Sequence, residues 1–252
     1  MKFGLERFIA IYLAYAVPIC LLLWVSRKAP ATWPAPPRPV LDRPKVDFFL
    51  AIGAAVLIFL LNIAYNSGHL LPRVANAQLE KLVFLADLAI IWSPLALVLL
   101  VRRQGLETCL LSPRGLLRKL AWGVALSILG MAVFLVVLRR FGDLGLPLTL
   151  LWKFDPIQAV QSVIQFLGMG FLLVRLVGIA GRMTAVLVCG ALYGLVKYPY
   201  YMGFYGMSFL TATGPIAFGV LVAFAVVYII LDRGDVLVMA ILHLFVDLIQ
   251  KS

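Results

Sequence analysis

Residues 82–101 read LVFLADLAIIWSPLALVLLV, a run of 20 residues that contains a single ionisable side chain, Asp87. At about 1.5 Å per residue, a helix of roughly 20 residues matches the hydrocarbon thickness of a bilayer. The backbone inside that layer must satisfy its own hydrogen bonds, so a spanning segment of this kind is an α-helix. The run therefore predicts a transmembrane helix.

Similar apolar runs fill most of the remaining chain. Of the 252 residues, 63% are hydrophobic and 13% are charged, and the mean hydropathy is +1.04. Soluble domains have about 25% charged residues, and a globule of this length could not bury so much apolar surface. We therefore predict an all-α polytopic membrane bundle of about eight transmembrane helices, forming a single membrane domain over residues 1–252. The expected spans lie near residues 8–25, 48–65, 82–101, 118–138, 157–177, 183–197, 215–231 and 236–250.

Prolines mark the connections between several of these spans. The segment 26–46 contains six prolines, which remove backbone donors and favour a semi-rigid extended loop at the membrane surface. Asp155-Pro156 and Gly214-Pro215 predict the starts of the fifth and seventh spans, because proline is favoured in the first turn of a helix.

The charge balance indicates a lipid partner and not nucleic acid. The chain carries 22 Lys and Arg against 11 Asp and Glu, a net charge of +11. The basic residues cluster beside apolar runs, where anionic lipid head groups favour them. Loops one, three, five and seven hold more Lys and Arg than the other side, so the positive-inside rule predicts both termini outside. The basic pairs are Arg27-Lys28, Arg102-Arg103, Arg118-Lys119 and Arg139-Arg140.

Ionisable groups within apolar spans are the first candidates for function, since they are costly there. His243 and Asp247 in the last span are four residues apart and share one helical face. They could form part of a polar site, or a structural pair that ties the last helix to its neighbours. Asp87, with Glu80 on nearly the same face, could be a catalytic acid or an ion ligand, or a group near a helix end.

Arg175 lies near the end of the predicted fifth span, and Lys197 opens an aromatic stretch. Basic side chains in such places usually extend to the lipid head groups. Three widely separated cysteines have no metal-binding or disulfide spacing, so they are expected to be small buried side chains, and no metal or cofactor is expected. These are Cys20, Cys109 and Cys189.

The segment from residue 158 to residue 252 resembles the CAAX protease and bacteriocin-processing (CPBP, or Abi) family of intramembrane proteases. The family's His-x-x-x-Asn/Asp motif is matched by residues 243–247. Its Phe-x-x-x-His motif aligns with residues 193–197, where Lys197 replaces the histidine. Its Glu-Glu-x-x-x-Arg motif aligns with residues 170–175, which keep Arg175 but have Gly170 and Phe171 in place of the glutamates.

The resemblance implies a degenerate member of the family. The family's glutamates and histidines are thought to activate a water molecule and stabilise the charged intermediate, and glycine and phenylalanine cannot take a proton. Lys197 could still donate to an oxyanion. The motif positions that remain as candidate catalytic residues are His243, Asp247, Arg175 and Lys197.

We therefore expect a membrane binding or scaffold protein of the bacterial plasma membrane that has lost protease activity. Its partner would be a lipid, a membrane protein or a peptide. Two alternatives stay open. One is an active intramembrane endopeptidase with a rearranged site that also uses Asp87, and the other is a small transporter or a subunit of a membrane complex.

Overall fold

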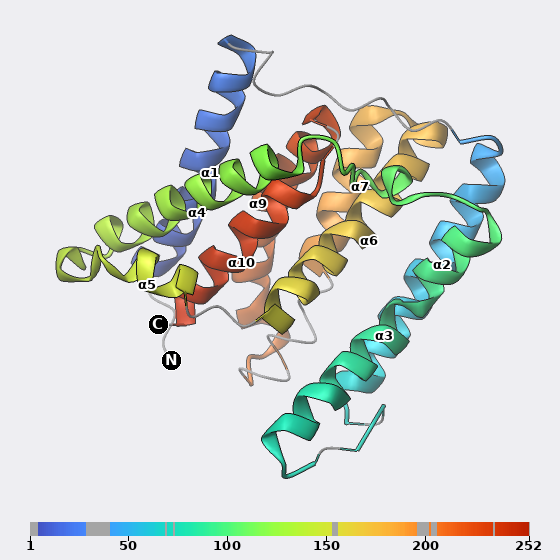
Figure 1. The fold of residues 1–252 in the computed structure, drawn as a ribbon, viewed down its shortest axis with the longest axis horizontal. Coiled ribbons are helices and arrows are strands. Elements are labelled where there is room, and N and C mark those ends of the chain that lie inside the picture. The colour runs from blue at the N-terminus through green and yellow to red at the C-terminus, as the bar shows by residue number, and fades with distance from the viewer. Residues whose placement is uncertain are drawn as a thin grey trace. The chain divides into compact units, whose positions relative to one another are not determined.

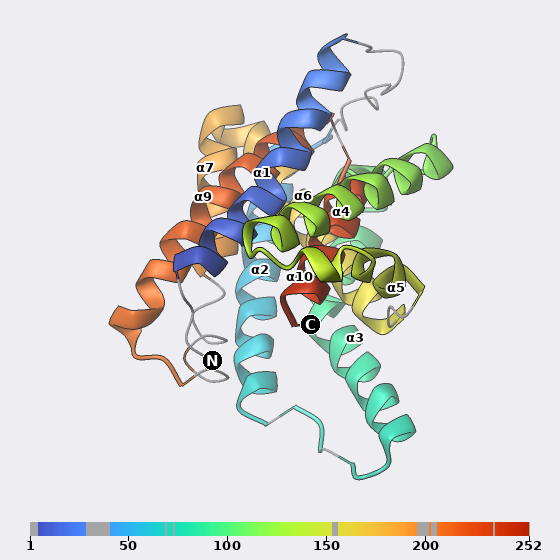
Figure 2. The same ribbon diagram turned by 90° about the vertical axis from the view of Figure 1, so that its left-hand side faces the viewer.

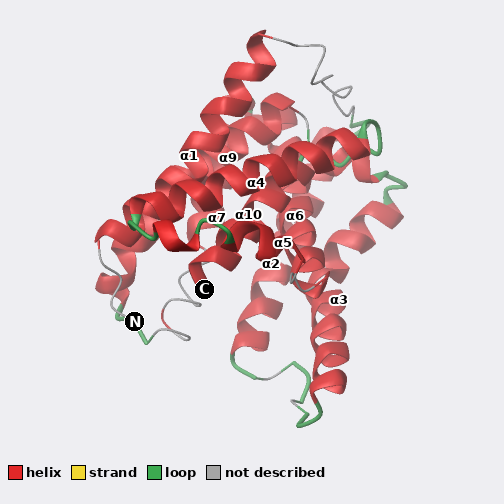
Figure 3. Ribbon diagram, turned by 60° about the vertical axis from the view of Figure 1, so that its left-hand side comes forward, coloured by secondary structure: helices red, strands yellow, loops and turns green. Residues whose placement is uncertain are grey.

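The computed structural model of the protein describes residues 5–28, 41–68, 70–72, 74–152, 156–195, 202, 206–233 and 235–251. Within these ranges the regular elements are helices and there is no strand (Figure 3), which confirms the predicted all-α class. The elements in chain order are α1 (Leu5–Lys28), α2 (Pro44–Asn66), α3 (Ala77–Val101), η2 (Leu106–Cys109), α4 (Leu116–Val137), η3 (Phe141–Asp143), α5 (Leu146–Trp152), α6 (Pro156–Ala180), α7 (Arg182–Leu195), α9 (Phe209–Arg233) and α10 (Leu237–Lys251).

Six of the predicted spans coincide with helices that are long and apolar enough to cross a membrane. These are α1, α2, α3, α4, α6 and α9. The predicted sixth and eighth spans fall on the shorter apolar helices α7 and α10. The protein is thus a multi-pass membrane protein with an all-α bundle. The extent of the bundle as one domain over residues 1–252 stays a prediction.

The helix ends agree with the proline pattern in two places and differ in a third. Pro44 and Pro156 begin α2 and α6, where a proline has no donor to lose. The predicted helix start at Gly214-Pro215 is wrong, because α9 already begins at Phe209. The Ser208 hydroxyl accepts the Thr211 backbone N–H at 3.3 Å and caps this helix, and Pro215 then lies inside it.

Two predicted connections also differ from the structure at their edges. Most of the Pro-rich segment 26–46 lies outside the described residues, but its first residues complete α1, which ends at Lys28. Residues from Pro44 onward belong to α2. Between the fourth and fifth spans, where no helix was predicted, residues 146–152 form the short helix α5.

The helices divide into two compact units. The first unit consists of residues 1–38, 111–166 and 228–252. In it, α4 packs against both α1 and α10 (Figure 2). A Cβ added to Gly130 would lie 2.6 Å from the Ala14 carbonyl oxygen, and one added to Gly123 would lie 2.7 Å from Ile241 Cδ1. Small residues on α4 thus permit close approach of both neighbours.

The second unit consists of residues 39–110 and 167–227. In it, α2 and α3 lie side by side as a helical hairpin (Figure 1). The Trp92 ring of α3 lies over Gly168 of α6, where an added Cβ would be 2.3 Å from Trp92 Cζ3. Gly181 joins α6 to α7 with φ +80°, a left-handed conformation that glycine adopts without strain.

Two glycines one turn apart bring α7 and α9 together. An added Cβ would lie 2.3 Å from Phe224 Cδ1 at Gly190, and 2.2 Å from Val220 Cγ2 at Gly194. Gly190 contacts Phe224, and Gly194, further along α7, contacts Val220, which comes earlier in α9. The two helices are therefore antiparallel. The stretch Gly190-Ala-Leu-Tyr-Gly194 is a small-xxx-small contact of the kind that membrane helices use to pack.

Replacing Gly194 with Ala is expected to lower the free energy of unfolding by about 1–3 kcal/mol. The new methyl group would overlap Val220, whose Cα is 3.2 Å from the added Cβ. Denaturant unfolding followed by circular dichroism in detergent micelles measures the change. Gly219→Ala on α9 is the matched control, because no atom lies within 4 Å of its added Cβ. The control should gain up to about 1 kcal/mol in helix propensity, and an equal loss in both variants would contradict the contact.

Candidate functional site

His243 of α10 lies in a mostly buried contact in the first unit. Its Nδ1 atom is 2.6 Å from the hydroxyl oxygen of Tyr15 on α1. The Phe166 ring lies with its centroid 5.4 Å from the imidazole centroid. The His243 Nε2 atom is 3.5 Å from Asp247 Oδ2, so the predicted shared helical face is confirmed. The carboxylate is the more open partner, with 43% of the Asp247 side chain exposed against 10% for His243.

The two ring nitrogens of His243 have different partners, the Tyr15 hydroxyl at Nδ1 and the Asp247 carboxylate at Nε2. The imidazole therefore joins α1 to α10 through one short hydrogen bond. Its Nε2 side faces the more exposed carboxylate of Asp247.

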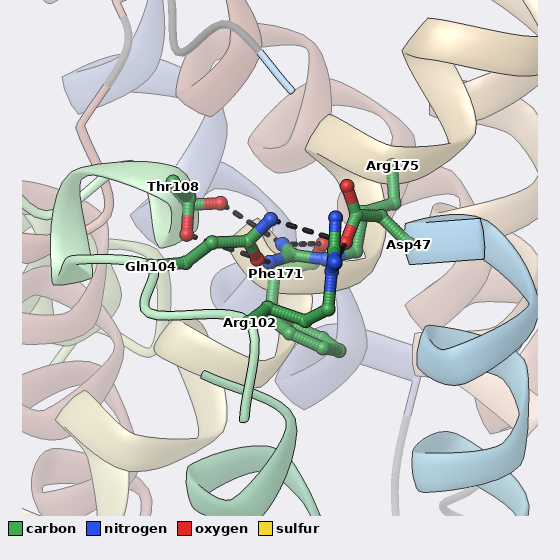
Figure 4. A network of polar contacts seen from close by, with 6 residues as sticks. All are labelled: Asp47, Arg102, Gln104, Thr108, Phe171 and Arg175. Atoms are coloured by element: carbon green, nitrogen blue, oxygen red, sulfur yellow. Dashed lines mark hydrogen bonds and ion pairs between the residues drawn. The ribbon is translucent and has the colours of Figure 1, made fainter. Parts of the chain in front are cut away.

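Arg175 of α6 lies in the second unit, in a network of polar contacts (Figure 4). Its guanidinium donates to the backbone carbonyls of Phe171, at 2.8 Å, and Thr108, at 3.1 Å, and to the side-chain oxygen of Gln104. Its Cζ lies 3.6 Å from the centroid of the Phe171 ring. The prediction that Arg175 extends to the head groups is wrong, because the side chain is fully buried. Helix α6 continues to Ala180, so Arg175 is not at the helix end.

Asp47 supplies the carboxylate of the same network. This buried residue of α2 accepts from Arg102 Nε at 2.8 Å and from Gln104 Nε2 at 3.1 Å (Figure 4). The Gln104 amide thus faces Arg175 with its oxygen and Asp47 with its nitrogen. The hydrogen bond with Asp47 raises the pKa of Arg102, so this guanidinium stays protonated. The network joins the start of α2, the end of α3, the segment that follows it, and α6.

The two cysteines near these helices are small buried side chains, as predicted. Cys109 of η2 and Cys189 of α7 are buried, whereas the prediction is wrong for Cys20 on α1, which is exposed. Burial raises the pKa of the Cys109 thiol to about 11, against the opposing effect of the nearby Arg175 charge. The thiol is therefore protonated at neutral pH and is a poor nucleophile.

A buried ion pair in the first unit was missed from the sequence. The ammonium group of Lys119 on α4 pairs with Asp235 and donates to the Ser112 carbonyl at 2.7 Å. Asp235 also accepts the backbone N–H of Leu237, the first residue of α10, at 2.8 Å. Burial raises the pKa of the Asp235 carboxyl, and the Lys119 contact opposes that rise. The prediction that Arg118-Lys119 faces the head groups is wrong for Lys119, which is buried, and stays a prediction for the exposed Arg118.

The remaining candidates are distributed over both units. Glu80 of α3 accepts the Val74 backbone N–H at 3.1 Å, so it acts as a group near a helix start, which was one of its two interpretations. Asp87 is buried in α3. Lys197 lies outside the described residues. The structure thus brings His243 together with Asp247 in one unit, and it places Arg175 in a separate network of the other unit.

Comparison of the chain with protein-family models, with curated proteins and with solved structures finds no match. The contacts of its own residues therefore carry the functional assignment.

Proposed function

We propose that this chain is an integral membrane binding or scaffold protein, a degenerate relative of the CPBP proteases that has lost peptide-bond cleavage. The observation that carries the proposal is the contact between Phe171 and Arg175. In the motif that residues 170–175 resemble, the second glutamate precedes the arginine by four residues, on the same helical face. In this chain the guanidinium carbon lies 3.6 Å from the Phe171 ring centroid instead.

The Phe171 ring provides the arginine with a favourable partner but with no proton acceptor. A guanidinium over an aromatic face is stabilised by the ring quadrupole. The retained motif residue is then engaged with Gln104 and with two backbone carbonyls. His243 is similarly bound to Tyr15. Residues that would serve chemistry in a protease thus connect helices in this chain, as expected of a scaffold.

A peptidase assay tests the loss of catalysis. The purified full chain, reconstituted in vesicles, is incubated with a prenylated peptide that ends in a CAAX sequence, and products are followed by mass spectrometry. We expect no cleavage above that of empty vesicles. The control is His243→Ala, with its fold checked by circular dichroism. Cleavage by the wild type that this variant abolishes would instead establish the rearranged endopeptidase, with His243, Asp247, Arg175 and Lys197 as its candidate residues.

If the partner is a protein, the binding role predicts that its binding does not require the residues at the motif positions. Chemical crosslinking in native membranes, followed by purification and mass spectrometry, should give the same partner for the wild type and for Asp247→Ala. The Asp247 carboxylate is partly exposed, so its removal should disturb the fold little. Loss of the partner in this variant would place the binding surface at His243 and Asp247.

A further inference from the structure

Three helix ends of the second unit lie at one level. Asp47, in the first turn of α2, pairs with Arg102 directly after α3. Arg175, near the end of α6, bonds to Gln104, two residues further on. A Cβ added to Gly178 on α6 would lie 3.4 Å from Pro44 Cβ. The start of α2 and the ends of α3 and α6 therefore form one end of the second unit.

Cations outnumber carboxylates at this end. Asp47 and Arg102 form an ion pair, so their charges neutralise each other. The exposed charged residues of this end are three cations, Arg43, Lys45 and Arg103, and two carboxylates, Asp42 and Glu107. The positively charged residues of this end are Arg43, Lys45, Arg102, Arg103, Arg175 and Arg182. The negatively charged residues are Asp42, Asp47 and Glu107.

The opposite end of the same unit has no such excess among the described residues. There α2 ends at Asn66 and α3 begins at Ala77. The described charged residues of these helix ends are Glu80 and Lys81, which balance each other. Among the described residues, the excess of cations thus lies at the end that holds Arg43, Lys45 and Arg103.

Exposed apolar side chains directly adjoin the exposed cations. Phe49 follows Lys45 by about one turn of α2 and is 71% exposed. Leu100 and Val101 are the last residues of α3 before the Arg102-Arg103 pair, and they are 74% and 68% exposed. Head groups and acyl chains are joined in the same way in a phospholipid, whereas free phosphate would use only the cations.

We propose that Arg43, Lys45 and Arg103, together called the basic edge, bind the head groups of anionic phospholipids, with acyl chains against the adjoining apolar residues. The proposal does not depend on the CPBP resemblance or on the contacts of His243. Each cation near an anionic surface strengthens binding roughly fivefold. The polar network of Asp47 and Gln104 places the cations by holding the three helix ends together.

The test is a binding titration with a fluorescent phosphatidylglycerol, using the full chain in a nonionic detergent. The edge variant is Lys45→Gln/Arg103→Gln. The matched control is Lys81→Gln/Arg139→Gln, which removes the same charges from exposed positions elsewhere. Arg103 and Arg139 also share a left-handed backbone, with φ of 51° and 57°. Circular dichroism melting of each variant verifies that the fold is retained.

The edge variant is expected to bind phosphatidylglycerol about thirtyfold more weakly than the wild type, and the control close to wild type. An unchanged affinity in the edge variant, or an equal loss in both variants, would overturn the proposal. Unlabelled phosphatidylcholine and inorganic phosphate are the competitors. Neither should displace the bound lipid at equal concentration. Displacement by phosphate would assign the cations to a free anion, and displacement by phosphatidylcholine would assign the site to acyl chains alone, so either result also contradicts the proposal.

Discussion

Replacing Lys119 with Met is expected to lower the free energy of unfolding by about 3–5 kcal/mol. The change keeps most of the side-chain volume but leaves the buried Asp235 carboxylate without its cation. The Ser112 carbonyl also loses its donor. Denaturant unfolding in micelles measures the loss. Arg118→Met is the control, since this neighbouring side chain is exposed and should change the stability by no more than about 0.5 kcal/mol.

The loss in Lys119→Met should depend on pH. Burial already raises the pKa of Asp235, so the folded state binds the proton more tightly than the unfolded state does. The contribution of this carboxyl to stability therefore falls as pH rises from the unfolded pKa through the folded pKa. Without Lys119 the folded pKa rises further, so the destabilisation should be small in acid and grow as pH increases.

Unfolding curves of the wild type and Lys119→Met over a range of pH measure this dependence. In the double variant Lys119→Met/Asp235→Asn no carboxyl remains to titrate at position 235, so its stability should depend less on pH than that of the single variant. Part of the lost stability should also return, because no uncompensated charge is left in the interior. A loss in the single variant that is the same at every pH would contradict a buried carboxylate at Asp235.

Replacing Arg175 with Met is expected to lower the free energy of unfolding by about 2–4 kcal/mol, because Gln104 and the Thr108 carbonyl are left without their donor. The expected effect is on stability even though Arg175 matches a catalytic motif. The same unfolding assay measures it. Arg103→Met, which removes an exposed guanidinium, is the matched control.

A second variant separates the two roles of Arg175. Phe171→Leu removes the aromatic partner of the guanidinium and keeps its hydrogen bonds. It should cost less than Arg175→Met, since the cation–π contact contributes about 2 kcal/mol at most when desolvated. A stable Arg175→Met protein would show that the network does not hold the helix ends together.

One helix contact could have been predicted from the small residues of the sequence. Gly190 and Gly194 are one turn apart within an apolar helix, which is a known signal for close packing. The partner helix could not be predicted in this way, because the signal says that a helix approaches but not which one. Val220 and Phe224 are identified as the partners by the packing of α7 on α9.

The serine cap of α9 is a similar case. Ser208 directly precedes the helix, and Thr211, whose backbone N–H it caps, lies in the first turn. Both residues are visible in the sequence. The prediction instead gave weight to Pro215, because proline is favoured in a first turn. Proline is also tolerated in a later turn of a membrane helix, where neighbouring groups satisfy the freed carbonyl. Thus proline alone did not locate the helix start.

The candidate site shows where local pattern stops being informative. The shared face of His243 and Asp247 follows from helical spacing, and the structure confirms it. The bond from His243 to Tyr15 joins residues 228 positions apart, and the Lys119–Asp235 pair joins residues 116 apart. No spacing rule connects such residues, since the contact depends on which helices pack together.

The sequence by itself determined that this protein is an all-helical, multi-pass membrane protein, because apolar composition and run length are local properties that a bilayer selects directly. The tertiary structure decided which ionisable side chains lie inside the protein. Lys119 and Arg175 were both predicted to reach the head groups, and both are buried. A long basic side chain near a helix end can extend to water or pair inside, and the outcome depends on whether a neighbouring segment presents an acceptor, as Asp235 and Gln104 do.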